Sequence, residues 1–230
     1  MSSALDGSDG RLDTERQLAL SYVPAGSRAA LATLWRLDST LGGLLAGGGQ
    51  PMVTQIKLAW WREALEALDQ APPPAEPLLQ AVARGLLPAG LTGATLAEMT
   101  EGWEILLTAE TVREEDLTTY ARQRGGLLFR CSAILLGQPS GDEVERAGQA
   151  WALVDLARRS GAAEEAEQAI DAARLRIAGL FGRRWPAALR PLGMLAALAR
   201  RDAARGIGRF ERQGAPSRML AMVRHRLTGK

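Results

Sequence analysis

The sequence predicts an all-α protein, and three observations support this fold class. Apolar residues recur at helical spacing through most of the chain, while sustained alternation of β-branched residues between turns is missing. No fixed-period repeat suggests a solenoid. Hydrophobic residues make up 47% of the chain but aromatic residues only 5%. The core must therefore consist mainly of aliphatic side chains, which suits the packing of helix on helix.

Prolines, glycines and acidic residues mark the ends of the expected helices. Pro51 suits the first position of a helix, and the Ala-Pro-Pro-Pro run at 71–74 forms an extended connector. Carboxylates at 114–116 complement the dipole at the start of a helix that Gly137 ends. On this basis we expect helices over residues 14–22, 27–45, 51–70, 76–87, 95–108, 113–136, 142–159, 162–182, 187–208 and 216–227.

Length and N-terminal composition predict a single domain. A chain of 230 residues is long enough to bury one substantial core. Residues 1–13 are polar and acidic, so we expect a flexible N-terminus followed by one helical domain over 14–230. The first residues lack the apolar stretch of a secretory signal, and no run of 18 apolar residues occurs. We therefore expect a cytoplasmic protein that does not span a membrane.

The chain has one cysteine and one histidine, and we expect neither to act in catalysis. Cys131 lies in an apolar run, so packing is its expected role, and a single cysteine excludes an intramolecular disulfide. His225 stands between two arginines near the C-terminus, which favours a surface position.

Positive charge is concentrated near the C-terminus. Residues 183–230 carry twelve basic residues against two acidic ones, a net charge of +10, whereas the rest of the chain carries −8. A basic amphipathic helix attracts an anionic membrane surface, which is one candidate partner. A core helix with an arginine-rich outer face is the alternative. Nucleic acid is not expected, because no nucleic-acid motif or row of aromatic residues accompanies the charge. The basic stripe consists of Arg201, Arg205, Arg209 and Arg212, and the apolar side of Leu192, Leu195, Ala196, Leu198 and Ala199.

The most specific segment of the chain covers residues 55–65, with the sequence QIKLAWWREAL. Adjacent positions of a helix point about 100° apart, so Trp60 and Trp61 cannot share one face. One indole can fill the core, and we expect the other to face a neighbouring helix or a cavity.

This segment resembles the Gln-x-(Arg/Lys)-Leu-x-Trp-Trp-Arg-x-Ala-Leu block of the squalene/phytoene synthase-like family, notably of its alphaproteobacterial and mitochondrial branches. Residues 34–38 (LWRLD) are similar to the helix with the family's first aspartate-rich motif, and residues 147–158 to the helix with the second. Residues 120–126 look like the family's Tyr-x-x-x-x-Ala-Gly segment. The resemblance implies the all-helical isoprenoid-synthase bundle.

Catalytically active members of that family join two prenyl diphosphates head to head. Aspartates four residues apart on facing helices hold the Mg²⁺ ions that neutralise the departing diphosphate. Asp38 and Asp155 are the candidate metal ligands here, but Gly42 stands four residues after the first and Arg159 four residues after the second. The resemblance implies the cavity residues Asp38, Trp60, Trp61, Tyr120, Asp155 and Arg158.

Two functions of different class remain open. The first is a non-catalytic, membrane-associated binding or assembly factor without a cofactor, similar to the mitochondrial branch that assists assembly of respiratory complex I. Its implied partner is a respiratory-complex subunit, and its implied location is the cytoplasmic surface of the inner membrane. The second is an active head-to-head prenyl transferase that uses Mg²⁺.

Four arginines bear on a ligand that both functions would share. Arginine binds phosphate groups well without a metal, so the cavity is a candidate site for a prenyl lipid or prenyl diphosphate. Pairing with acidic helices, or solvation, is the alternative. These arginines lie on the two helices that line the cavity in catalytic relatives, at Arg122, Arg130, Arg158 and Arg159.

Overall fold

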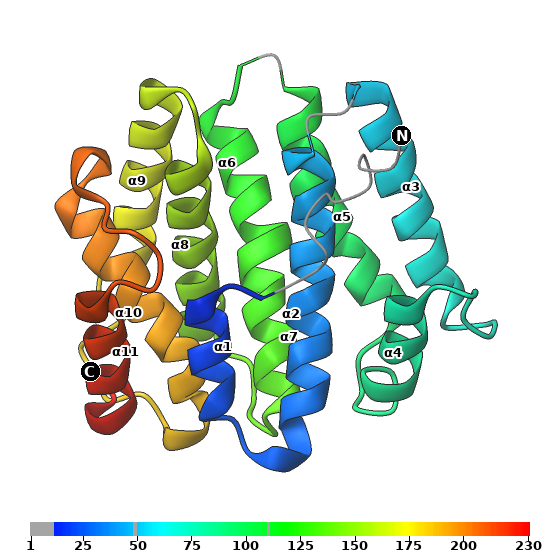
Figure 1. The fold of residues 1–230 in the computed structure, drawn as a ribbon, viewed down its shortest axis with the longest axis horizontal. Helices are drawn as coiled ribbons and strands as arrows, with labels where there is room; N and C mark the ends of the chain where they lie inside the picture. The colour runs from blue at the N-terminus through cyan, green and yellow to red at the C-terminus, as the bar shows by residue number, and fades with distance from the viewer. Residues whose placement is uncertain (1–11, 48–49, 110) are drawn as a thin grey trace, which may run out of the picture.

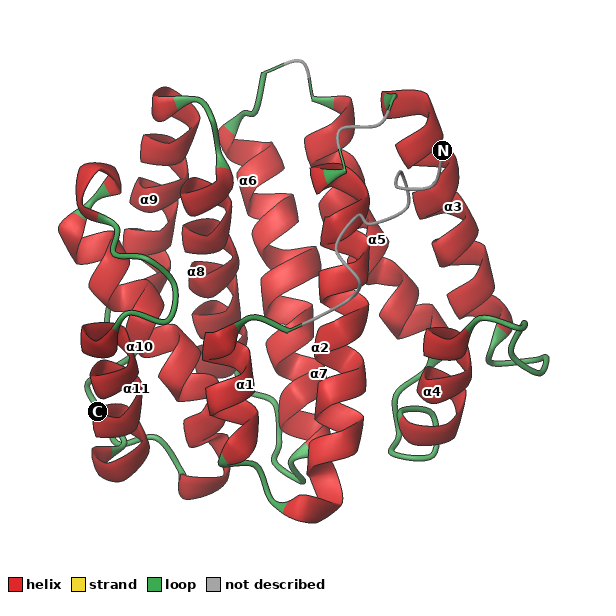
Figure 2. Cartoon of the chain, viewed as in Figure 1, coloured by secondary structure: helices red, strands yellow, loops and turns green. Residues whose placement is uncertain are grey.

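A computed structural model describes residues 12–47, 50–109 and 111–230, and confirms the predicted all-α class (Figure 1). Figure 2 shows helices joined by loops, with no strand in the part of the chain that is described. Most of the predicted flexible N-terminus, 1–13, lies outside the described residues. Within the described ranges, no helix is both long and apolar enough to cross a membrane.

The long helices lie side by side in a bundle (Figure 1). The N-terminal half contains α1 (Thr14–Ser21), α2 (Ala25–Ala46), α3 (Pro51–Ala67), α4 (Pro77–Gly85) and α5 (Gly93–Thr108). The C-terminal half contains α6 (Glu114–Tyr120), η1 (Ala121–Gly126), α7 (Leu127–Leu135), α8 (Asp142–Arg159), α9 (Ala163–Ile177), η2 (Ala187–Leu189), α10 (Arg190–Arg205), η3 (Ile207–Arg209) and α11 (Pro216–Thr228). Helices α3 and α4 form one end of the bundle, and α9, α10 and α11 form the other.

Local sequence explains where most helices begin and end. The Asp13 carboxylate caps α1 by accepting from the backbone N–H of Arg16 at 2.8 Å. Helix α9 ends at Ile177, earlier than predicted, and Gly179 then adopts a φ of +82°. Gly206, with a φ of +78°, likewise ends α10 before the predicted residue. Positive φ suits glycine, because it has no Cβ.

The predicted helix over 113–136 is continuous in space, but it is not uniform. Its middle turn is the π-helix η1, between α6 and α7. Such insertions are rare and often mark functional sites. Two glycines in η1 lie against α8: a Cβ on Gly125 would lie 2.1 Å from the carbonyl oxygen of Gly148, and a Cβ on Gly148 would lie 2.1 Å from that of Gly125. The backbones of η1 and α8 therefore touch directly.

The core is mainly aliphatic, as the composition requires. Trp35 of α2 is fully buried, and its indole N–H donates to the hydroxyl of Ser132 at 3.1 Å. Cys131 is also buried, and burial raises the pKa of its thiol to about 12. The expected packing role of Cys131 is confirmed.

Helix α10 is a core helix with a basic outer side. Leu192, Leu195 and Leu198 are each at most 3% exposed, and Ala196 and Ala199 are buried beside them. The apolar side that the sequence offered for membrane contact therefore lies inside the protein.

His225 is fully buried, and the predicted surface position was wrong. Helix α11 folds back on α10, and the imidazole meets the rings of Phe181 and Trp185 edge to face at centroid distances of 6.0 and 5.8 Å. On the α10 side it lies against Gly193, where a Cβ would come within 2.1 Å of Nε2. The flanking arginines favoured an exposed position, but His225 lies on the side of α11 that faces the protein interior.

The imidazole of His225 is held in its neutral form. Neither ring nitrogen makes a well-aligned hydrogen bond in the described part of the chain, although the backbone of Lys230 lies close enough to oppose the lowering of the imidazole pKa. Burial, with the positive charges of Arg200 and Arg190, lowers its pKa from 6.5 to about 4.

Replacing Gly125 or Gly148 by alanine is expected to lower the free energy of unfolding by about 1–3 kcal/mol, because each added Cβ forces η1 and α8 apart. Urea denaturation measures this change. Gly26→Ala is the matched control, since a Cβ there meets nothing within 4 Å and alanine favours a helix by up to about 1 kcal/mol. Equal stability of all three variants would contradict the close contact.

The free energy of unfolding is expected to fall as pH drops from 6.5 toward about 4. Over this range His225 binds a proton in the unfolded chain but stays neutral in the folded protein. The His225→Leu variant should lose less stability over the same interval. Thermal unfolding of both proteins across this pH range measures the difference, and parallel pH profiles would contradict it.

Candidate functional site

The first predicted metal ligand, Asp38, is fully buried on α2 and surrounded by arginine nitrogens. Arg124 donates through Nε to Oδ1 at 2.8 Å and through Nη2 to Oδ2 at 3.2 Å. Arg16 of α1 donates through Nη2 to Oδ2 at 2.8 Å. Both oxygens of this carboxylate are therefore engaged by guanidinium groups.

The second predicted ligand, Asp155 of α8, contacts two guanidinium groups, but within the described residues its Oδ2 accepts no well-aligned hydrogen bond. Its Oδ2 forms an ion pair with Arg124 Nη2 at 2.8 Å. Its Oδ1 accepts from Arg159 Nε at 3.1 Å. Arg124 thus joins the two carboxylates that the family resemblance assigns to Mg²⁺.

The π-helix η1 places Arg124 between the aspartates. The side chain is 1% exposed and donates through Nη1 to the hydroxyl of Tyr120, one turn earlier. Its guanidinium carbon lies 4.1 Å from the centroid of the Trp103 ring and 4.9 Å from that of Trp151. Aromatic faces attract a cation in this arrangement. Hydrogen bonds, ion pairs and aromatic faces together fix this buried arginine in position.

The pKa values follow from burial and from these charges. Burial alone would raise the pKa of Asp38, but Arg124 and Arg16 bring it below its ordinary 3.8. The pKa of Asp155 likewise falls to about 2, because Arg124, Arg159 and Arg16 outweigh burial. Burial raises the pKa of the Tyr120 hydroxyl. At neutral pH both aspartates are charged, and their charge is balanced within the protein.

The positions of the two missing aspartates are occupied by other groups. At Gly42, a Cβ would lie 2.7 Å from the Trp103 ring, so a longer side chain requires this indole to move. At the other position, Arg159 covers Asp155 instead of adding a carboxylate.

This set of residues does not fit a magnesium cluster. Mg²⁺ prefers octahedral oxygen ligands from carboxylates, water and phosphate. The oxygens of Asp38 and Asp155 already meet guanidinium nitrogens, and no group of three acidic, histidine or cysteine side chains gathers within the described residues. A cation that binds here has to displace a buried arginine.

A small pocket opens beside the cluster. Its volume is about 120 Å³, and its lining includes Arg16, Arg124, Arg159 and Trp103. Ligand pockets usually measure roughly 300–1,000 Å³. The pocket therefore has room for a small polar group but not for two prenyl chains.

The tryptophan pair does not join this cluster. Trp61 is 6% exposed in the core, and Trp60 is 44% exposed on the outer face of α3. Their rings meet edge to face at 5.4 Å. Neither indole lines the pocket. Of the expected cavity residues, the structure brings Asp38, Tyr120 and Asp155 together around Arg124.

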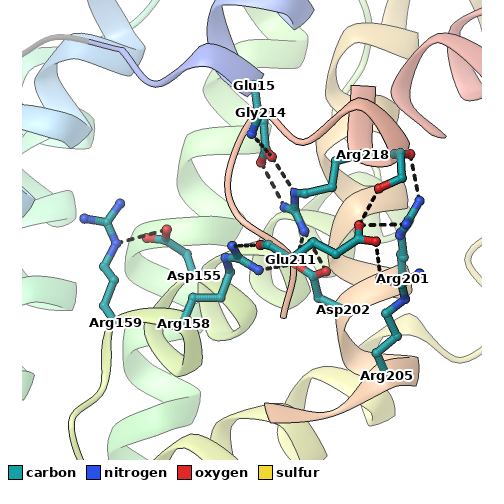
Figure 3. A network of polar contacts seen from close by, with 11 residues as sticks. Glu15, Asp155, Arg158, Arg159, Arg201, Asp202, Arg205, Glu211, Gly214 and Arg218 are labelled. Atoms are coloured by element: carbon teal, nitrogen blue, oxygen red, sulfur yellow. Dashed lines mark hydrogen bonds and ion pairs between the residues drawn. The ribbon is translucent and has the colours of Figure 1, made fainter. Parts of the chain in front are cut away.

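Arg158, the remaining expected cavity residue, belongs to a second polar network (Figure 3). It donates through Nη1 to Asp202 at 3.0 Å and through Nη2 to the carbonyl oxygen of Glu211 at 2.7 Å. The Glu211 carboxylate in turn pairs with Arg201 and Arg205, each at 2.7 Å. Two arginines of the predicted basic stripe are therefore neutralised by an ion pair within the chain, although Arg205 remains 38% exposed.

The centre of this second network is Arg218 of α11, which is 2% exposed (Figure 3). It donates through Nε and Nη2 to Glu15 at 2.5 and 2.9 Å, and through Nη1 to both oxygens of Asp202 at 2.7 Å. Because Glu15 lies on α1, Asp202 on α10 and Arg218 on α11, these three helices are held together.

Sequence reasoning missed Arg16 and Arg124, the two buried arginines of the cluster. One signal was present: Arg124 stands one turn after Tyr120 within a segment that becomes strongly apolar, and a charged residue in such a segment is informative. Of the four arginines that the sequence favoured, Arg159 lines the pocket and Arg158 belongs to the second network. Arg122 is exposed, and Arg130 pairs with the exposed Glu98 at 3.8 Å.

Comparison with known families agrees with this geometry. The model of the squalene/phytoene synthase family matches residues 10–222, so the chain belongs to that family. The match confirms the family and the isoprenoid-synthase type of bundle that the Trp-Trp segment implied. No curated protein matches the chain.

Replacing Arg124 by methionine is expected to destabilise the protein by about 3–5 kcal/mol, because two buried carboxylates lose their shared partner. The loss should be larger at about pH 7 than at about pH 5. Without Arg124, burial raises the pKa of Asp38, so at the lower pH the carboxyl group binds a proton and no longer carries a buried charge. Urea denaturation at both pH values measures it. Arg113→Ala removes an exposed ion pair and should change stability by less than about 0.5 kcal/mol; an equal loss in both variants would contradict the role of Arg124.

Proposed function

We propose that this protein is a non-catalytic member of the squalene/phytoene synthase family that serves as a membrane-associated binding or assembly factor. The observation that carries the proposal is the position of Arg124, whose guanidinium pairs with both Asp38 and Asp155. The guanidinium of Arg124 therefore lies where catalytic relatives need Mg²⁺.

The chemistry of prenyl transfer supports this proposal. Ionisation of a prenyl diphosphate requires positive charge that is free to neutralise the leaving group. Here the charges of Arg16 and Arg124 are already balanced by Asp38 and Asp155. If Mg²⁺ replaced Arg124 between the aspartates, the buried guanidinium would lose its partners, which costs several kcal/mol.

The second candidate is an active head-to-head prenyl transferase. The observation that favours it is the survival of one aspartate on each of the two facing helices, Asp38 and Asp155, with Tyr120 beside them. In this case substrate and Mg²⁺ would have to displace Arg124 and open the small pocket.

The partners of a binding factor follow from the same proposal. A prenyl lipid or prenyl diphosphate is the small ligand, held through arginines such as Arg159 and without a metal. A respiratory-complex subunit is the protein partner that the family resemblance suggests. The cytoplasmic surface of the inner membrane is the proposed location.

Incubation of the full chain with farnesyl or geranylgeranyl diphosphate and Mg²⁺ is expected to release no diphosphate, because the aspartates are already paired. A phosphate-coupled assay measures release, with Asp155→Asn as the matched control. Release that requires Mg²⁺ and is lost in this variant would establish the transferase instead.

A thermal-shift series separates ligand binding from catalysis. Farnesyl diphosphate without metal is expected to raise the melting temperature of the wild type, and less so that of Arg159→Ala, because Arg159 lines the pocket and is 56% exposed. Equal shifts in the two proteins, or none in either, would remove the prenyl ligand from the proposal.

A further inference from the structure

The outer side of α11 carries an exposed stripe that the cluster does not explain. Leu220 and Leu227 are 70% and 72% exposed, and the exposed Arg224 lies between them. Positions four and three apart share one helix face. On the opposite side, Met222 and His225 are buried against α10. Helix α11 is therefore amphipathic, but its outer side carries exposed leucines as well as polar residues.

Further basic side chains surround this stripe. Arg200 is an exposed residue of α10 whose guanidinium carbon lies 4.0 Å from the centroid of the Phe181 ring, and that ring meets His225 of α11 at 6.0 Å. Arg183 and Arg184 are exposed in the loop before Trp185. The backbone N–H of Trp185 donates to the carbonyl oxygen of Gly229 at 2.9 Å, which holds this loop against the end of α11.

The positive charge of this region is not balanced locally. Between residues 178 and 230 only Asp202 and Glu211 are acidic. Asp202 is 1% exposed between Arg158 and Arg218, and Glu211 is engaged by Arg201 and Arg205. Within the described residues, no ion pair involves the basic side chains around the stripe, namely Arg183, Arg184, Arg200 and Arg224.

We infer that this region, hereafter the α11 surface (Leu220, Leu227, Arg224, Arg200, Arg183 and Arg184), docks on an anionic phospholipid membrane. The two leucines enter the boundary between headgroups and acyl chains, and the arginines contact lipid phosphates. Helices that lie in a membrane interface combine these two kinds of residue. The sequence offered α10 as one candidate for this role, with a core helix as the alternative, and the apolar side of α10 is buried.

The α11 surface fits a membrane better than the other exposed apolar stripe does. Met52, Ile56 and Trp60 are exposed on α3, at the opposite end of the bundle (Figure 1). The basic side chains of α3 are Lys57 and Arg62, and Arg62 is paired with Glu104, so charge complementarity favours α11. Duplex nucleic acid would pair with the arginines but leaves the exposed leucines without a partner.

This inference deepens the membrane-associated part of the proposed function and rests on it, but it does not depend on the loss of catalysis. Diphosphate release tests the site around Arg124, whereas vesicle binding tests the α11 surface. Failure of either proposal is therefore visible separately.

The test is co-sedimentation of the full chain with vesicles of phosphatidylcholine alone, or of phosphatidylcholine and phosphatidylglycerol in equal parts. We expect binding to the anionic vesicles only, and weaker binding as salt screens the arginines. Leu220→Ser/Leu227→Ser should weaken partitioning by about tenfold or more, because less apolar surface is buried. Arg224→Glu should weaken it by about tenfold or more by reversing one charge.

Two variants at the other end of the bundle serve as matched controls. Met52→Ser/Ile56→Ser changes side chains that are 72% and 63% exposed, close to the leucines of α11. Arg84→Glu makes the same change of charge as Arg224→Glu, but on α4. Both controls should bind anionic vesicles like the wild type, and Arg224→Glu carries the test if the double leucine variant fails to fold.

Three results would overturn the inference. The first is equal binding, or none, to neutral and anionic vesicles. The second is loss of binding in the α3 variant while the α11 variants bind normally. The third is binding to a duplex DNA oligonucleotide as strong as to vesicles, unchanged when both leucines are replaced, which would assign the arginines to nucleic acid.

Discussion

The ion pairs of Arg124 with Asp38 and Asp155 are the constraint on which the middle of this bundle depends. Charged groups are rarely buried without a partner, because the loss of water costs several kcal/mol per ion. Here each charge has an opposite charge within 3.2 Å. Helices α2 and α8 must therefore keep their positions relative to η1, or an isolated charge remains in an aliphatic core.

Backbone geometry and charge support each other in this arrangement. The glycine contact between η1 and α8 brings the backbones close enough for Arg124 and Asp155 to meet. Buried ion pairs contribute little net stability compared with apolar side chains, but they penalise every arrangement in which a partner is missing. The cluster thus specifies one register of the helices more strongly than it stabilises the fold.

A similar arrangement of charges occurs where α1, α10 and α11 meet. Arg218 lies between Glu15 and Asp202 as Arg124 lies between its aspartates. In both places an arginine fork supplies several donors in a fixed plane, which lysine does not. Nearly every basic residue of this chain is arginine, and the buried arginines are used to join helices that are distant in sequence.

Most of the fold followed from local sequence. Periodicity, proline and glycine placed the helices close to their observed ends, because helix boundaries depend on residues within one turn. The π-turn at 121–126 was not predicted; it coincides with the contact of Gly125 with Gly148 of α8, which local sequence does not reveal. Of the site, Asp38, Tyr120 and Asp155 were identified through the family resemblance. Arg16 was not, because its partner Asp38 lies 22 residues away on another helix.

By itself the sequence determined the helical class, the family, and the absence of paired aspartates, because these depend on residue types at fixed spacing. Only the tertiary structure decided that the Trp103 ring fills the space beside Gly42 and that the Arg124 guanidinium lies between the two remaining aspartates. It also decided that His225 is buried, that the leucines of α10 lie in the core, and that Leu220 and Leu227 of α11 are exposed. The physical reason is that burial and charge pairing are set by neighbours across helices, which spacing along one helix does not encode.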